Sequence, residues 1–238
     1  MSVFDHKAVV WDLDGTLYFQ RDMRIRMAAA LLLYYLIHPF SVRELLAVKR
    51  FREIREAWSK KDENDPKLSE TAERLKSEDP GLDGLSALQY AKVSADTGTP
   101  PRIVKKAVDM WIYDKPLKII YKCRDKRADE LIKLLTKKGT DNYIFSDYPI
   151  EDKLRALKTE GIKGTYAATD ERVGVLKPDP RGLKLIMEDH GLVPGDILMI
   201  GDRMSRDGEA AKNAGCDYFI LSKSRIKRIM EYKKLTGE

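Results

Sequence analysis

The sequence predicts an α/β protein: a doubly wound parallel sheet with an all-helical domain inserted after its first strand. An apolar segment, residues 7–12, ends abruptly in acidic residues and indicates a buried strand. Residues 19–117 carry helical signals throughout, and beyond them short apolar segments alternate with helical ones, as in a sheet covered on both faces. We therefore assign residues 1–18 and 118–238 to an α/β core domain and residues 19–117 to a helical domain.

Start and stop signals divide the helical domain into shorter helices. Pro39 ends the first helix, and Ser41 and Glu44 form a capping box that opens the second. Pro66 places residues 60–67 in a loop. The expected helices cover residues 20–37, 41–58, 68–76, 85–95 and 99–113.

The core domain alternates between strands and helices. Strand segments are short and rich in β-branched or aromatic residues, and glycines such as Gly139 and Gly191 follow the helices. The expected strands cover residues 7–12, 142–145, 166–168, 196–200 and 218–221. The expected helices cover residues 125–138, 150–158, 177–190, 206–214 and 224–234.

Two acidic residues, Asp12 and Asp14, end the first strand with one residue between them. Gly15 and Thr16 follow, so an ordinary Asp-Gly turn is one interpretation. A functional site is the other, because burying unpaired carboxylates is costly unless a cation or a hydrogen-bond network compensates them.

Polar residues also lie at the ends of other expected strands. Ser146 ends the second strand, Asp202 follows the fourth, and Asp207 comes shortly after it. Lys177 opens the helix between these two strands. Ligands of such sheets bind at the carboxyl ends of the strands, so we expect these side chains to converge. An all-oxygen set of carboxylates suits Mg²⁺ better than zinc, and the sequence thus predicts a metal and phosphate site.

These residues, in this order, resemble the four motifs of the haloacid dehalogenase superfamily of aspartate-nucleophile hydrolases. The matching positions are residues 12–16, Ser146, Lys177-Pro178, and Gly201-Asp202 with Asp207. The resemblance covers the core and implies a Rossmann-like fold there. It also implies that the helical insertion after the first motif is a cap that closes over the site.

The resemblance further implies a phosphatase that forms an aspartyl-phosphate. Asp12 would be the nucleophile, and Asp14 would protonate the leaving oxygen and then activate water. Dehalogenases of this superfamily lack the second acid and its P-type ATPases have threonine there. Asp14 therefore points to a phosphatase or a phosphomutase.

The binding residues are implied in the same way. Those expected to hold Mg²⁺ are Asp12, Asp14, Asp202 and Asp207, with Asp14 acting through its backbone carbonyl. Those expected to bind the phosphoryl group are Ser146, Asp147 and Lys177, and Lys177 is also expected to be catalytic, because it supplies positive charge to the phosphoryl oxygens. Two positions depart from the family pattern: Asp147 replaces a frequent asparagine, and Arg203 replaces a small residue.

The composition limits the classes of ligand and the cellular location to be expected. The net charge is +6, but 44 basic residues are interspersed with 38 acidic ones, which argues against nucleic acid and suits small anionic ligands. The two cysteines, Cys123 and Cys216, indicate neither a disulfide framework nor a zinc site. We expect no signal peptide, and the apolar runs are shorter than the roughly 20 residues that a membrane span needs. We expect a soluble, cytoplasmic protein.

Together these features predict a Mg²⁺-dependent phosphomonoester hydrolase acting on a small phosphorylated metabolite. A phosphomutase is the alternative within the enzyme class, and a catalytically idle, basic binding protein is the alternative outside it. Candidate substrate contacts near the start of the helical domain are Tyr18, Arg21, Arg24 and Arg26, and a solvated basic helix face is the alternative interpretation of the three arginines. The substrate and the oligomeric state are left open by the sequence.

Overall fold

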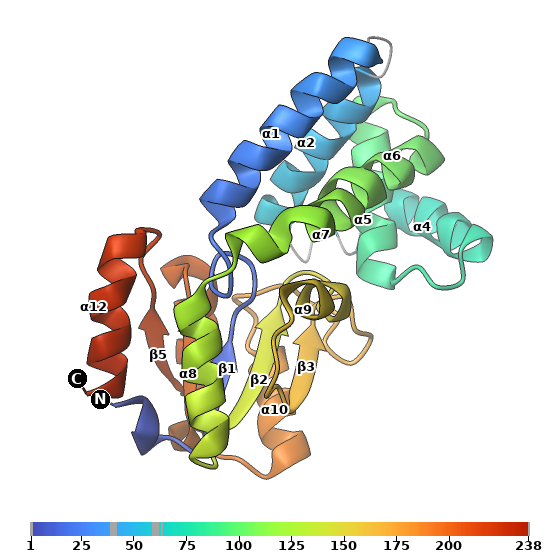
Figure 1. Ribbon diagram of the computed structural model, residues 1–238. Helices are drawn as coiled ribbons and strands as arrows, with labels where there is room; N and C mark the ends of the chain where they lie inside the picture. Colours follow the sequence, from blue (N-terminus) through green and yellow to red (C-terminus); the bar gives the residue numbers. More distant parts are fainter. Residues whose placement is uncertain (1, 39–41, 59–61, 63, 238) are drawn as a thin grey trace. The chain divides into compact units, whose positions relative to one another are not determined.

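The computed structural model describes residues 2–38, 42–58, 62 and 64–237 (Figure 1). The chain divides into two compact units, one formed by Met1–Met23 with Ile120–Glu238 and the other by Arg24–Ile119. The first unit contains a β-sheet, and the second is helical and inserted between the first two strands.

In the described residues, five strands form one parallel sheet with the order β3-β2-β1-β4-β5. Trp11 at the end of β1 pairs with Ile144 on β2 and with Ile200 on β4. The carboxyl ends of these three strands therefore share one edge of the sheet. The strand bounds are β1 (Ala8–Trp11), β2 (Asp141–Ser146), β3 (Gly164–Ala167), β4 (Ile197–Gly201) and β5 (Asp217–Ile220). The predicted parallel α/β fold is confirmed.

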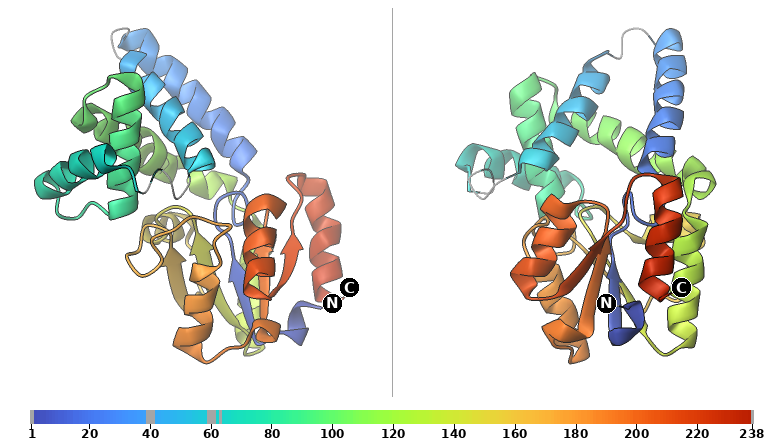
Figure 2. Two further views of the ribbon diagram at one scale, coloured as in Figure 1. Left: turned by 180° about the vertical axis from the view of Figure 1, so that it is seen from behind. Right: turned by 90° about the vertical axis from the view of Figure 1, so that its left-hand side faces the viewer.

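Helices cover both faces of this sheet. Figure 2 shows α8 (Lys126–Lys137) and α12 (Arg225–Thr236) on one face, and α10 (Arg181–His190) and α11 (Glu209–Ala214) on the other. Because both faces are covered, all four residues of β1 are buried, which explains its unbroken apolar sequence. The short α9 (Glu151–Leu157) connects β2 to β3.

The inserted unit is built from packed helices. In it α4 packs against α5, and α2 packs against both α5 and α6. The helix bounds are α1 (Gln20–Ile37), α2 (Val42–Ala57), α4 (Pro66–Glu78), α5 (Gly84–Thr97), α6 (Pro101–Val108) and α7 (Lys115–Ile120), with a π-helical segment at Asp109–Asp114. Large side chains such as Phe51, Tyr90 and Trp111 are buried within it.

Two predicted starts of helices are wrong. Pro66 lies in the first turn of α4 and not in a loop, because Asp65 caps the helix by accepting from the Lys67 N–H and the missing N–H of proline does no harm there. Lys177 does not open α10, which begins four positions later at Arg181. The capping box expected at Ser41 lies outside the described residues.

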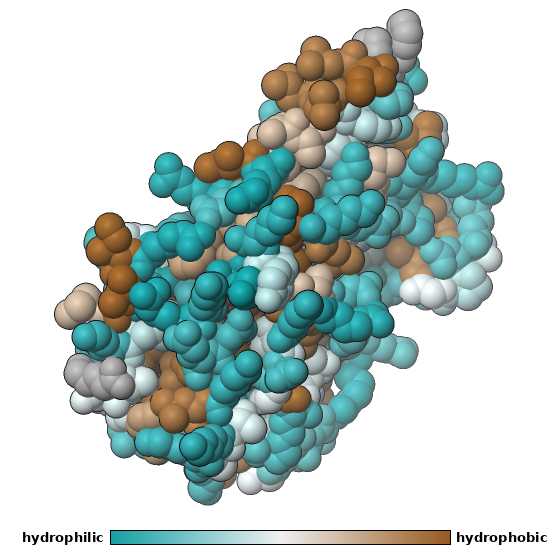
Figure 3. All heavy atoms as spheres, in the orientation of Figure 1, coloured by the Kyte–Doolittle hydropathy of each residue, from teal (hydrophilic) through white to brown (hydrophobic). Residues whose placement is uncertain are grey.

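Helix α1 exposes aliphatic side chains along its second half. Leu32, Leu33, Leu36 and Ile37 are each more than 60% exposed, and Figure 3 shows hydrophobic side chains gathered over this end of the helix. Patches of this kind are typical of surfaces where proteins associate. Among the described helices, none combines the length and apolarity that crossing a bilayer requires.

Candidate active site

Four predicted site residues meet at the shared edge of the sheet. Asp12 follows β1, and its N–H donates to the carbonyl of Ile200 on β4 at 2.8 Å. Asp202 follows β4, and Asp207 lies in the π-helical turn Met204–Gly208 just beyond it. All these carboxylates and the side chain of Lys177 are buried. The parallel register brings together residues that are far apart in the sequence.

Lys177 is the cation of this cluster. Its Nζ lies 2.6 Å from an oxygen of Asp12 and 2.6 Å from an oxygen of Asp207, and it also donates to the carbonyl of Phe145 at 3.2 Å. Burial opposes the charge on Lys177, but the nearby carboxylates outweigh it and raise the pKa of the ammonium above its ordinary value. Lys177 is therefore charged in the folded protein.

One lysine does not neutralise the carboxylates around it. Asp12, Asp202 and Asp207 each present an oxygen, and these oxygens lie within 4.8 Å of one another. Burial, followed by the negative charge of Asp207, raises the pKa of Asp12 and raises that of Asp202 to about 6. Three acidic side chains surround the ammonium of Lys177, and the raised pKa values of Asp12 and Asp202 reflect their burial and their mutual repulsion. The all-oxygen, under-neutralised cluster fits a divalent cation such as Mg²⁺.

Hydrogen bonds fix the carboxylates in this cluster. Thr16 donates its hydroxyl to the second oxygen of Asp12 at 2.9 Å. The second oxygen of Asp207 accepts the backbone N–H groups of Asp202 and Arg203 at 3.1 and 3.0 Å. Asp207 thus holds both Lys177 and the turn that carries Asp202.

Asp14 lies in a separate environment with its own cation. Both of its carboxylate oxygens lie 2.7 Å from Nζ of Lys153, and the hydroxyl of Tyr18 donates to one of them. Sequence reasoning missed Lys153, because a lysine within the charged sequence of residues 151–158 is typical of a solvated helix face. It did single out Tyr18, although as a substrate contact.

The side chains of Ser146 and Asp147 each accept a backbone N–H group. The hydroxyl oxygen of Ser146 accepts the N–H of Tyr148 at 3.1 Å, and a carboxylate oxygen of Asp147 accepts the N–H of Lys177 at 2.8 Å. Asp147 thereby anchors the loop that carries Lys177. The phosphate-binding roles of both residues stay predictions, and Arg21, Arg24 and Arg26 are exposed on α1.

The turn after Asp14 fits closely against Asp202. Gly15 has a φ of +102°, and a Cβ built on it would lie 2.5 Å from a carboxylate oxygen of Asp202. Only glycine adopts this backbone readily and leaves room for the carboxylate.

A buried arginine holds the same turn from the C-terminal helix. Arg228 donates to the carbonyl of Thr16 and to a carboxylate oxygen of Asp125, each at 2.9 Å, and also to the carbonyl of Gly15. Sequence reasoning missed Arg228, because one arginine in a basic terminal helix carries no signal of burial.

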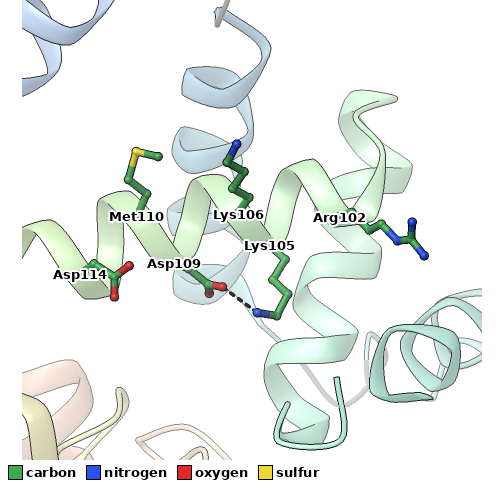
Figure 4. Close-up of a pocket in the computed structure, with 6 residues that line it drawn as sticks. All are labelled: Arg102, Lys105, Lys106, Asp109, Met110 and Asp114. Carbon is green, nitrogen blue, oxygen red and sulfur yellow. Dashed lines mark hydrogen bonds and ion pairs between the residues drawn. The ribbon is translucent and has the colours of Figure 1, made fainter. Parts of the chain in front are cut away.

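The helical unit contains a pocket of its own, with a volume of about 320 Å³ (Figure 4). Its lining residues are Arg102, Lys105, Lys106, Asp109, Met110 and Asp114. Lys105 is paired with Asp109 at 2.7 Å, and Arg102 is paired with Glu78 at 2.9 Å. These cations already have carboxylate partners, and none of the predicted catalytic residues lines this pocket.

Solved structures share the fold at low sequence identity. YfnB from Bacillus subtilis, in a crystal structure with bound magnesium, is 14% identical over 98% of this chain and 99% of its own, with a TM-score of 0.55. CbbY from Rhodobacter sphaeroides, crystallised with phosphate, is 15% identical over 92% of this chain and 88% of its own, with a TM-score of 0.53.

Sequence comparison gives a short local match and a long family match. Phosphoglycolate phosphatases from two strains of Vibrio vulnificus are 48% identical over 46 residues, which is 19% of this chain and 20% of theirs. This chain therefore matches about a fifth of the length of these curated relatives. The profile of the haloacid dehalogenase-like hydrolases matches residues 6–215. The chain, with its acidic cluster at the edge of a parallel sheet, belongs to the haloacid dehalogenase-like hydrolases.

Proposed function

We propose that the protein is a Mg²⁺-dependent phosphatase that hydrolyses phosphomonoesters through an aspartyl-phosphate on Asp12. The observation that carries this proposal is the pairing of two acids with different environments, two residues apart. Asp12 forms an ion pair with Lys177 inside the carboxylate cluster. Asp14 lies outside the cluster and forms an ion pair with Lys153. Separate environments suit separate roles for two carboxylates in one site.

In the first step, a carboxylate oxygen of Asp12 attacks phosphorus, and the bond from phosphorus to the ester oxygen breaks. Asp14 gives its proton to that leaving oxygen. In the second step, water attacks phosphorus, Asp14 takes a proton from the water, and the bond from phosphorus to Asp12 breaks. Inorganic phosphate leaves, Asp12 is again an ionised carboxylate, and Asp14 again carries the proton with which it began.

Positive charges assist both of these steps. Lys177 holds Asp12 and brings positive charge to the phosphoryl oxygens. Asp12, Asp202, Asp207 and the backbone carbonyl of Asp14 would hold Mg²⁺, and the cation would supply the positive charge that the cluster lacks. The magnesium bound in YfnB supports this choice of metal.

We further propose a small phosphorylated metabolite as substrate and the helical insertion, expected over residues 19–117, as the cap domain that selects it. The local match to phosphoglycolate phosphatases makes phosphoglycolate the first compound to test. The free thiols of Cys123 and Cys216 support a reducing, cytoplasmic location.

The test is release of inorganic phosphate from a panel of phosphoglycolate, sugar phosphates and nucleotides, with Mg²⁺ or with EDTA. We expect Mg²⁺-dependent release from at least one small ester. Isomerised sugar phosphate without free phosphate would establish the phosphomutase alternative. No turnover of any ester, together with salt-sensitive binding to nucleic acid, would replace the proposal by a binding protein.

A further inference from the structure

Lys153 is a buried cation that the proposed reaction does not yet use. It lies in the first turn of α9, its side chain is 8% exposed, and its Nζ is 2.7 Å from both oxygens of Asp14. The ring of Tyr148 lies beside the ammonium, with 4.8 Å from Nζ to the ring centroid. Lys153 is thus enclosed between an aromatic ring and one carboxylate.

The arrangement around Asp14 is asymmetric. One carboxylate oxygen accepts from both Lys153 and Tyr18, whereas the other accepts from Lys153 alone. Tyr18 is buried, and its phenolic hydroxyl donates to Asp14. The oxygen with a single donor has the greater freedom to exchange a proton with substrate or water.

Stability alone is a poor reason for this ion pair. A buried pair gains little over a well-packed apolar pair, because removing both charges from water costs about as much as their attraction returns. Asp14 follows the end of β1, in a turn where neither strand nor helix fixes its side chain. A catalytic acid gains from fixed geometry, since small displacements of reacting groups cost large factors in rate.

We propose that Lys153, assisted by Tyr18, is a positioning residue for Asp14. Lys153 holds both carboxylate oxygens, and Tyr18 adds a second donor to one of them, so that the other oxygen, with one donor, exchanges a proton with the leaving group and with water. This inference rests on the proposed phosphatase activity.

Two esters whose leaving groups differ in their need for a proton distinguish the positioning role of Lys153 from a merely structural one. p-Nitrophenolate leaves without a proton, whereas the benzyl alkoxide needs one, so only the second ester depends on a well-placed Asp14. The parameter to measure is kcat/KM, which covers the steps up to phosphoryl transfer to Asp12. General acid catalysis contributes about 10²- to 10⁴-fold, and misplacing the acid forfeits part of it.

We expect Lys153→Met to lower kcat/KM for benzyl phosphate by about 10- to 100-fold, and that for p-nitrophenyl phosphate by less than about 3-fold. Tyr18→Phe keeps the buried ring, removes only the hydroxyl, and should give the same ester preference with a smaller loss. Lys163→Met is the matched control, because Lys163 is paired with Asp141 at 2.7 Å but is 52% exposed, and it should change neither value.

A double-mutant cycle completes the test. In an Asp14→Asn background, Lys153→Met should cause no further loss, because the two residues act as one unit. Equal losses for both esters, or a full additional loss in the Asp14→Asn background, would overturn the positioning role while the phosphatase activity of the wild type stands. A wild type that hydrolyses neither these two esters nor any ester of the panel would overturn both proposals. If Lys153→Met does not fold, Tyr18→Phe decides by the same ester comparison.

Discussion

The ammonium of Lys177 lies 2.6 Å from a carboxylate oxygen of Asp12, although 165 positions separate the two residues in the sequence. The contact forms because β1 and the loop before α10 meet at one edge of a parallel sheet. It places the proposed nucleophile against a buried positive charge, which holds the carboxylate in place.

Removing the charge of Lys177 should destabilise the fold. Lys177→Met leaves Asp12 and Asp207 without their shared cation, and breaking a buried ion pair from one side costs about 3–5 kcal/mol. Urea unfolding in EDTA measures this loss, and the exposed control Lys163→Met should lose less than about 1 kcal/mol. Equal stability of the two variants would show that Lys177 is not the counter-ion of the cluster.

The pKa of Asp202 predicts a dependence of stability on pH. It is raised from 3.8 to about 6, so in metal-free protein the folded state retains a proton that the unfolded state releases between these values. The contribution of Asp202 to the free energy of unfolding is therefore greatest below about pH 4 and is lost as the pH rises through about 6.

Asp202→Asn removes this pH-dependent contribution to the free energy of unfolding. In EDTA, we expect the variant to gain about 3 kcal/mol relative to wild type between pH 4 and pH 7. Mg²⁺ should stabilise the wild type at pH 7 and leave the variant unchanged, because a ligand of the folded state stabilises only where it binds. Parallel pH profiles, or the same response to Mg²⁺ in both proteins, would contradict the assignment of Asp202.

Gly15 should tolerate no side chain. A Cβ would strain the backbone at a φ of +102° and would lie 2.5 Å from an oxygen of Asp202. We expect Gly15→Ala to lower stability by about 1–3 kcal/mol and to weaken stabilisation by Mg²⁺. Thermal unfolding with and without Mg²⁺ tests this, with Gly98→Ala as a control that shares the positive φ but has open space around it. Equal responses of the two variants to Mg²⁺ would rule out displacement of Asp202.

Arg228 should couple the C-terminal helix to the turn after Asp14. Arg228→Met leaves the carboxylate of Asp125 with only the hydroxyl of Tyr232, at 3.2 Å, as a side-chain partner among those described, and frees the carbonyls of Gly15 and Thr16. A loss of about 3–5 kcal/mol in urea unfolding is expected. The exposed Arg172, paired with Asp189, provides the control variant Arg172→Met. A loss no larger than that of the control would contradict the coupling.

The residues that sequence could locate are those at the ends of strands. Asp12, Ser146 and Asp202 end or follow apolar segments, and the geometry of parallel strands makes such positions converge. Lys177 could be located by its order among the motifs. Its loop conformation could not be predicted, because Pro178 and Pro180 are typical of the first turn of a helix.

The partners that sequence missed come from the helices around the sheet. Lys153 and Arg228 lie among other charged residues, and nothing in their spacing tells which charge turns inward. Their burial depends on tertiary contacts with Asp14 and Asp125, which lie more than 100 positions away. The order of elements was thus predictable, whereas the counter-ions of the buried acids were not.

The central claim is that Asp12 is the nucleophile of a phosphomonoester hydrolase. The most direct test compares wild type and Asp12→Asn for release of inorganic phosphate from the best ester of the panel, with Mg²⁺ present. The substitution keeps the shape of the side chain and removes the attacking oxyanion, so we predict that kcat falls by on the order of 10³-fold or more. Turnover by Asp12→Asn close to that of the wild type would contradict the account.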